Sequence, residues 1–258
     1  MKTPIKTDYS FVCARTLNQL LPESTAIKSA LLFDGQIECE LAFSDRPITI
    51  TTNKYVIYEF WDCVTKNPYL IADMADALHE SMDPQMIYLL QNDWPRFKDP
   101  FYRSALFFLL NRYSLNGTIS HGNFSTDSYS TLCGKSLINF FENYPVDKLN
   151  IVHYNEDKYY KTLTRFNDDE VLLLPFGNLK SGPLVKTSQE GHEKYDNNLT
   201  VLSNVLLNYD NKFVVVVKAN RRILKEMNRF NIVMVNNQGE STNDERFAEE
   251  LIITNLEI

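Results

Sequence analysis

Short apolar runs separated by helical patterns recur along this chain, and this alternation limits the fold more than any other feature of the sequence. Such runs, rich in valine and isoleucine, are typical of buried strands, and helices between strands are typical of a doubly wound α/β sheet. The last strands follow one another closely, so we expect them to pair antiparallel. The predicted strands are SALLF (29–33), PITITT (47–52), LNIVHY (149–154), EVLLLPF (170–176), KFVVVVK (212–218), NIVMVN (231–236) and ELIITN (250–255).

A long helical region interrupts the alternation after the second predicted strand. From about residue 58 to residue 110 the chain is rich in leucine, methionine, alanine and aromatic residues, and prolines divide it. Another helix is predicted over 136–144, and further helices over 14–21 and 198–209. We therefore predict an α/β domain made of residues 1–57 and 146–258, with a helical lobe, residues 58–145, inserted into it.

The length and charge of the chain narrow its class. With 258 residues and 44% hydrophobic content, it can bury a sizeable core. Its formal net charge is −7, so the chain as a whole lacks the basic surface that usually drives affinity for nucleic acids. The four cysteines are far apart and include no C-x-x-C pair, which favours reduced, mostly buried thiols.

No segment predicts export or membrane insertion. The beginning, MKTPIKTDYS, has no apolar signal core, and the longest apolar runs, ALFFLL and FVVVV, are too short to span a bilayer. We expect a soluble cytoplasmic protein.

One segment carries a family resemblance. DPFYRSALFFLLNRYSLNG (99–117) resembles the target-recognition segment of Dam-type N6-adenine DNA methyltransferases, whose pattern is D-P-x-x-R-A-x-x-F-x-x-L-N-R-x-x-x-N-G. The resemblance implies a Rossmann-like sheet of the S-adenosylmethionine-methyltransferase type with an inserted helical lobe. It places the cofactor loop in SALLFDGQIE (29–38), the catalytic strand in EVLLLPFG (170–177) and the closing strand in EELIITN (249–255).

The catalytic motif of that family is degenerate here. These enzymes flip adenine out of the duplex, and the Asp of a D-P-P-Y motif accepts hydrogen bonds from its amine while the Tyr stacks on the ring. That arrangement aims the nitrogen at the methyl group, and positioning supplies much of the rate. The matching residues are Leu174, Pro175, Phe176 and Gly177. A leucine cannot accept a hydrogen bond, so the resemblance predicts an inactive site.

The cofactor motifs are degenerate as well. The family's F-x-G-x-G loop corresponds to Phe33, Asp34, Gly35, Gln36 and Ile37. The β-branched Ile37 resists the close approach that glycine allows. The acidic residue that takes ribose hydroxyls would fall at Thr51, Thr52 or Asn53, and the N-terminal K-x-x-G-G-K element is missing from KTDYSFVCARTL. We expect no bound cofactor, with Ile37 and Phe176 filling the space of S-adenosylmethionine.

The loop after the resembling helix is a candidate for binding DNA or a protein partner. No Lys or Arg lies between Arg112 and Lys135, so few phosphates can be neutralised. We predict that residues 111–126 form a surface loop for protein contacts with weak, salt-sensitive DNA affinity. The competing interpretation is internal packing against the sheet. The candidate residues are Asn111, Arg112, Tyr113, Asn116, Gly117 and Phe124, with Leu115 and Ile119 as further apolar anchors.

Other groups of polar or aromatic residues have plainer interpretations. The histidines His79, His121, His153 and His192 lack metal-ligand spacing, and we predict no metal site. Asp168, Asp169 and Glu170 are expected in a solvated loop. The basic cluster around Arg221 and Arg222 predicts a solvated helix start. Core or lobe packing is the expected role of Phe140, Phe141, Tyr159 and Tyr160.

Three functional hypotheses follow. The first is a catalytically inactive homologue of the adenine methyltransferases, expected in a bacteriophage genome, that binds an active methyltransferase, itself or, weakly, DNA. The second is a divergent but active enzyme that uses S-adenosylmethionine; no substitute [DNS]-P-P-[YFW] occurs, which favours the first. The third is an unrelated nucleotide-binding protein, but the chain contains no G-x-G.

Overall fold

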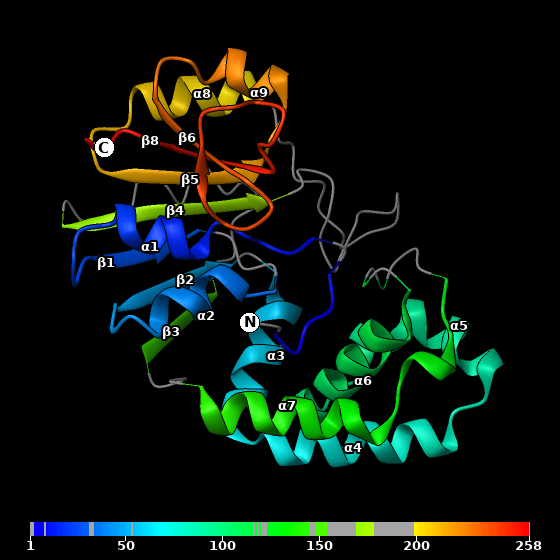
Figure 1. The fold of residues 1–258 in the computed structure, drawn as a ribbon. Coiled ribbons are helices and arrows are strands. Elements are labelled where there is room, and N and C mark those ends of the chain that lie inside the picture. Colours follow the sequence, from blue (N-terminus) through cyan, green and yellow to red (C-terminus); the bar gives the residue numbers. More distant parts are fainter. Residues whose placement is uncertain are drawn as a thin grey trace.

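The computed structural model describes residues 3–7, 9–30, 34–52, 54–115, 117, 119, 123–144, 148–153, 169–177 and 199–257. Within these residues the strands form one eight-stranded sheet in the order β3-β2-β1-β4-β5-β8-β6-β7. The strands are β1 (Ala26–Ser29), β2 (Ile48–Thr52), β3 (Leu149–His153), β4 (Glu170–Gly177), β5 (Phe213–Lys218), β6 (Asn231–Val235), β7 (Ser241–Thr242) and β8 (Glu250–Thr254). The predicted α/β class is confirmed (Figure 1).

The first five strands are parallel, and β8 is antiparallel between β5 and β6. The connections run outward from β1 in one direction and from β4 in the other, so the strand order reverses between these two strands. In open α/β sheets, ligands bind beyond the carboxyl ends of the strands at such a reversal. Glu250, the first residue of β8, pairs with Lys218, the last residue of β5, so it also lies at the carboxyl end of the sheet.

Each face of the sheet has its own hydrophobic cluster. Side chains alternate along β4, so Val171 and Leu173 join one cluster while Leu172, Leu174 and Phe176 join the other. Helices α1 (Ala14–Leu20) and α2 (Gln36–Ala42) contribute to the first cluster. Helices α8 (Leu199–Leu207) and α9 (Arg221–Glu226) cover the other face (Figure 1).

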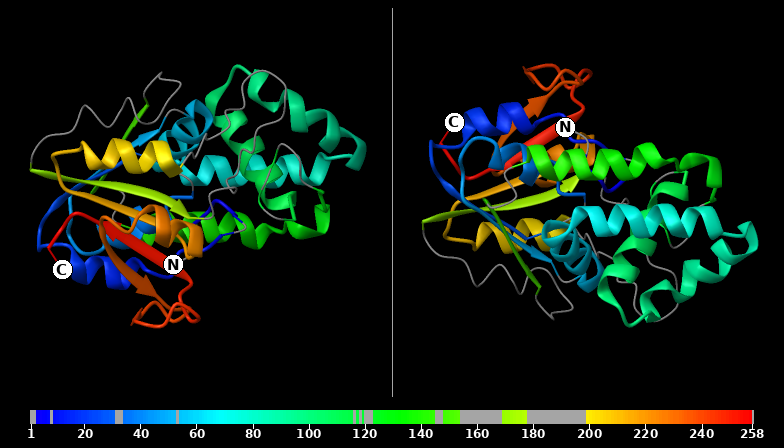
Figure 2. Two further views of the ribbon diagram at one scale, coloured as in Figure 1. Left: turned by 90° about the horizontal axis from the view of Figure 1, so that it is seen from above. Right: turned by 90° about the horizontal axis from the view of Figure 1, so that it is seen from below.

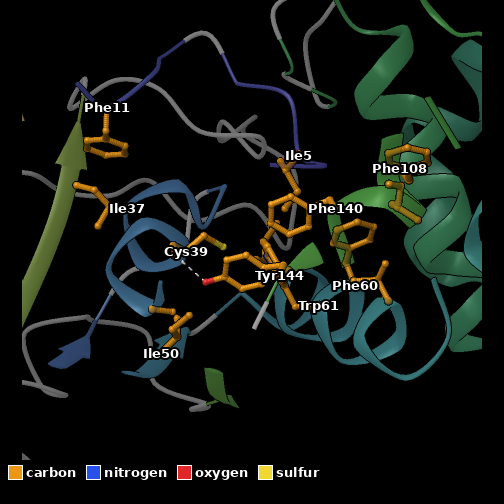
Figure 3. Packing of buried hydrophobic residues seen from close by; sticks show 14 of the residues in the cluster. Ile5, Phe11, Ile37, Cys39, Ile50, Phe60, Trp61, Phe108, Phe140 and Tyr144 are labelled. Carbon is orange, nitrogen blue, oxygen red and sulfur yellow. Dashed lines mark hydrogen bonds between the residues drawn. The ribbon is translucent and has the colours of Figure 1, made fainter. Parts of the chain in front are cut away.

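A group of helices lies between β2 and β3 in the chain. Figure 2 shows that they extend beyond the sheet on one side. The first cluster continues into them, and the Tyr144 hydroxyl donates to the Cys39 carbonyl at 2.9 Å (Figure 3), so helices and sheet share one core. These helices are α3 (Tyr55–Lys66), α4 (Pro68–Ser81), α5 (Pro84–Asp93), η1 (Trp94–Arg96), α6 (Pro100–Tyr113), η2 (Thr126–Ser128) and α7 (Thr131–Asn143).

The D-P-F-Y-R segment has a structural role at the start of α6. The Asp99 side chain accepts a hydrogen bond from the Tyr102 N–H at 2.7 Å, and Pro100 occupies the first helical position, where its missing N–H costs nothing. Arg103 then forms a two-pronged ion pair with Glu59 of α3, and only 13% and 5% of these two side chains are exposed. The segment thus begins a helix and braces it against its neighbour.

Among the described elements, helix α2 and the two-residue strand β7 are not predicted from the sequence, and β1 lies earlier than predicted. We expected a strand over 29–33 followed by a loop, but β1 ends at Ser29 and residues 31–33 lie outside the described part. Helix α2 begins directly after Gly35, whose φ of 74° suits glycine. All four cysteines are free, and Cys13, Cys39 and Cys63 are buried, as predicted. No helix among the described residues is long and apolar enough to cross a membrane.

Candidate functional site

A layer of buried polar side chains lies at the carboxyl end of the sheet near β1. Asp34 and Glu38 flank the start of α2, and the Ser29 hydroxyl donates to Glu38 Oε1 at 2.7 Å. The Thr51 hydroxyl donates to the Ser29 carbonyl at 2.9 Å. Burial raises the pKa of Asp34 to about 6 and that of Glu38 to about 7. Buried titratable groups with shifted pKa values are typical of functional sites, so this end of the sheet is the candidate site.

Residues near the beginning of the chain cover the carboxyl end of the sheet beside β4. We define the N-terminal segment as residues 3–7 and 9–13; it passes the end of β4 on its way to α1 (Figure 1). Gln36 fixes this segment through its amide. Gln36 Oε1 accepts from the Phe11 N–H at 3.1 Å, and Gln36 Nε2 donates to the Phe11 carbonyl at 3.0 Å. Both main-chain hydrogen-bonding groups of Phe11 are thereby satisfied.

Glu250 holds the same segment from the other side of β4. It is fully buried and accepts hydrogen bonds from the Tyr9 hydroxyl at 2.5 Å and from the N–H groups of Val12 and Cys13 at 3.1 and 2.8 Å. Burial raises the pKa of its carboxyl group, and these donors oppose that shift. The three donors explain how a carboxylate is accommodated in the core.

Asn111 binds the segment where it meets the helical lobe. Its Oδ1 accepts from the Lys6 N–H at 2.7 Å, and its Nδ2 donates to the carbonyls of Lys6 and Gly117 at 2.8 Å. The neighbouring Arg112 donates to the Pro4 carbonyl at 2.5 Å and lies over the Phe108 ring. The Asn-Arg pair therefore anchors the beginning of the chain.

Three glycines with left-handed backbone angles contact the N-terminal segment. A Cβ atom at Gly117 would lie 2.1 Å from the Lys6 carbonyl oxygen, one at Gly177 2.8 Å from the Tyr9 ring, and one at Gly239 2.5 Å from the Val12 carbonyl oxygen. All three have a positive φ, which favours glycine independently of space. The glycines thus permit the close approach of the segment along its length.

Tyr9 and Phe11 fill the space beside the end of β4. Their rings meet edge to face with centroids 5.1 Å apart, and both touch the position of a Cβ at Gly177. The register between β4 and β5 shifts between Pro175 and Gly177, a bulge that turns the end of β4. Figure 3 shows Phe11 and Ile37 near this end of β4.

The expectation for the cofactor space needs correction. Ile37 and Phe176 are both buried, as predicted, but they do not share one space. Ile37 belongs to the cluster on the α1–α2 face, and Phe176 and Leu174 belong to the cluster on the α8–α9 face, because side chains alternate along β4. The residues that fill the carboxyl end are Tyr9 and Phe11.

The end of α6 and part of the loop that follows it, where the structure describes it, are internal. Tyr113 and Ile119 are buried, and the Tyr113 hydroxyl bonds to His79 Nδ1 at 2.8 Å. Packing, the alternative to a surface contact, therefore describes these two residues, and the prediction that they are surface anchors is wrong. Leu115 is 59% exposed and Phe124 is half-buried. Asn116 lies outside the described residues.

The remaining candidates have structural roles where they are described. Phe140 and Phe141 pack on Trp61, as predicted. The side chain of Asn220 caps α9 and leaves Arg221 and Arg222 exposed, which confirms a solvated helix start. Within the described part, no three His, Cys, Asp or Glu residues gather as metal ligands. Outside it lie Phe33, Asn53, His121, Tyr159, Tyr160, Asp168 and His192.

Sequence reasoning missed the N-terminal segment and Glu250. Glu250 begins an apolar strand, a position at which a glutamate is ordinarily exposed. Its partners lie 237 to 241 residues away, so no local pattern connects them. The local signal in the sequence is that KTDYSFVCARTL carries aromatic residues, Tyr9 and Phe11, and no glycine.

The sequence matches no protein-family model, and it matches none of the curated proteins. The class of the chain is therefore defined by its fold: a Rossmann-like α/β protein with a mostly parallel sheet.

Proposed function

We propose that this protein is a catalytically inactive homologue of the Dam-type adenine DNA methyltransferases and acts as a non-catalytic protein-binding module. The resemblance of residues 99–117 suggests the ancestry. The fold supports it, because the catalytic and closing strands that the resemblance implies, β4 and β8, lie in one sheet on either side of β5.

The proposal that the protein is inactive rests on the side chains at the end of β4. Leu174 stands where the family has an aspartate, and its side chain lies in the core of the α8–α9 face. Gly177 stands where the family has a stacking tyrosine, and the Tyr9 ring occupies the space beside it. At these two positions the side chains therefore offer neither the carboxylate acceptor nor the stacking ring that the family uses for adenine.

The residues at the carboxyl end do not fit S-adenosylmethionine. In the family, glycines in the cofactor loop and in the N-terminal element allow the cofactor to approach the backbone. Here Ile37 replaces one glycine, and Tyr9 and Phe11 stand in the N-terminal element. Gln36, next to Ile37, is already bonded to Phe11. We therefore assign no step to this cofactor.

Methyl transfer to DNA is expected to be absent. The purified full chain, incubated with unmethylated duplex and S-adenosylmethionine carrying a labelled methyl group, should leave the DNA at background counts. A Dam-type enzyme in a parallel tube serves as the positive control. Millimolar S-adenosylmethionine should leave the melting temperature unchanged. Incorporation that disappears when Pro175 or its neighbours are replaced would mean that the divergent, active enzyme is the correct interpretation.

The partner surface we propose is the outer side of α5 with the adjoining loop. Four apolar side chains here are between 49% and 67% exposed: Met86, Tyr88, Leu89 and Leu115. The Tyr88 ring packs edge-on against the Phe124 ring, with the ring centroids 6.2 Å apart. Exposed apolar side chains that lie together mark protein contacts. DNA is the weaker candidate, since Arg112 is engaged with Pro4 and Phe108.

Association through this surface is expected to depend on its leucines. In sedimentation velocity, the full chain, alone or mixed with an active Dam-type methyltransferase, should form a complex that Leu89→Ser with Leu115→Ser abolishes. Leu132→Ser is the matched control, because Leu132 is 69% exposed on α7, outside this surface. A complex that tolerates the double replacement but not Leu132→Ser would place the interface elsewhere, and a monomer in both mixtures would refute the binding role.

A further inference from the structure

The N-terminal segment is held chiefly through its main chain, as a bound peptide would be. Asn111 bonds to both the N–H and the carbonyl of Lys6, and Gln36 does the same at Phe11. Glu250 accepts two successive N–H groups, those of Val12 and Cys13. These side chains come from α6, α2 and β8, which are far apart in the sequence, and all three bind the main chain of the N-terminal segment.

Side chains of the segment add anchors between these main-chain contacts. Ile5 and Phe11 are 3% and 7% exposed and belong to the shared core (Figure 3). Tyr9 packs against Gly177 and donates to Glu250. Glycines at 117, 177 and 239 let the segment lie directly on the neighbouring backbone and side chains. Main-chain bonds supply affinity and side-chain sockets supply selectivity in peptide recognition generally.

We propose that the carboxyl end of this sheet is a binding site for an extended peptide, and that the N-terminal segment is its tethered ligand. The inference rests on these contacts alone and holds whether or not the chain descends from methyltransferases. The ligand class is a peptide with apolar or aromatic residues at the positions of Ile5, Tyr9 and Phe11, recognised along its main chain by Asn111, Gln36 and Glu250.

The tether hides the site from free peptide. A linked ligand acts at an effective concentration on the millimolar scale, so an added peptide cannot displace the native segment at micromolar concentration. Weakening the segment inside the full chain removes this competition. Tyr9→Gly with Phe11→Gly deletes two anchors while leaving the residues that bind the main chain untouched.

The probe is a fluorescein-labelled peptide KTPIKTDYSFV, residues 2–12, with a C-terminal amide that supplies the N–H of Cys13. Fluorescence anisotropy should show saturable binding to the Tyr9→Gly, Phe11→Gly chain. Binding to the unaltered chain should be at least about tenfold weaker, because its site is filled by the tethered segment. A peptide carrying the same two glycine replacements should also lose about tenfold or more.

Three results would overturn the proposal. One is a folded double variant that does not bind the peptide at all. The second is equal binding to the variant and the unaltered chain, and the third is equal binding of the two peptides. Where the double variant shows no cooperative melting, the readout is rescue: peptide added in trans should restore the melting transition, and failure to restore it refutes a separable ligand site.

Discussion

Replacing Arg103 by methionine is expected to lower the free energy of unfolding by about 3–5 kcal/mol. The replacement keeps an aliphatic stem between α3 and α6 but removes the guanidinium that faces Glu59, whose side chain is only 5% exposed. A buried carboxylate without its partner carries a large desolvation cost. Arg103 also donates to the Phe97 carbonyl, so that acceptor loses its partner too. Urea denaturation monitored by circular dichroism measures the change.

Two further variants separate the ion pair from packing. Glu59→Leu combined with Arg103→Met should recover most of the loss, since an apolar pair of similar volume is often as stable as a buried ion pair. Arg96→Met tests an exposed pair: Arg96 and Asp93 are 82% and 53% exposed, and the expected cost is below about 1 kcal/mol. If Arg103→Met and Arg96→Met lowered the free energy of unfolding equally, the buried Arg103–Glu59 pair would contribute no more to stability than an exposed one.

Glu38→Gln is expected to stabilise the protein at pH 8 and to leave it unchanged near pH 4. Burial raises the pKa of Glu38 from 4.5 to about 7, so the folded chain keeps this proton at a pH at which the unfolded chain has lost it. The contribution of Glu38 to stability is therefore greatest below pH 4.5, falls as the pH rises toward 7, and stays low above that. The full difference is on the order of 3 kcal/mol. Glutamine preserves the acceptor for Ser29 and cannot ionise.

The test compares unfolding free energies of the two proteins from pH 4 to pH 8.5. The curves should coincide at the acidic end and separate with increasing pH. Glu80→Gln, at an exposed position of α4, should give the unaltered profile. Asp34, whose pKa burial raises to about 6, adds a pH dependence of the same sign that remains in Glu38→Gln. A constant loss of stability at every pH would show that Glu38 is ionised in the folded chain without cost.

The sheet could be predicted because its information is local. A β-branched run such as FVVVV identifies a strand by itself, and six of the seven predicted strands agree with the structure to within a residue or two. Helix α2 was missed because its sequence, QIECELA, is short and follows a glycine that was interpreted only as part of a cofactor loop. The first residues of α2 overlap the stretch that resembles the cofactor loop, so the sequence predicts a loop where the helix begins.

The roles of the candidate residues could not be predicted, because their partners are distant. Asn111 is predicted to bind DNA or a protein partner, but it bonds to the backbone of a residue 105 positions earlier. Ile37 and Phe176 are both predicted to fill the cofactor space, but the alternation of side chains along β4 places Phe176 on the opposite face of the sheet. A sequence shows which side chains can form hydrogen bonds, and only the three-dimensional arrangement shows with which groups they do so.

The hydrogen bond between Tyr9 and Glu250 joins residues 241 positions apart, and this separation has a consequence for biosynthesis. At about 5–20 residues per second, a ribosome adds Glu250 roughly 10–50 s after Tyr9. Throughout that interval the N-terminal segment cannot be fully bound, because Glu250 has not yet been synthesised. A chain released before β8 would keep Tyr9, Val12 and Cys13 without their common acceptor. Protection of the first residues from proteases should therefore distinguish finished chains from prematurely terminated ones.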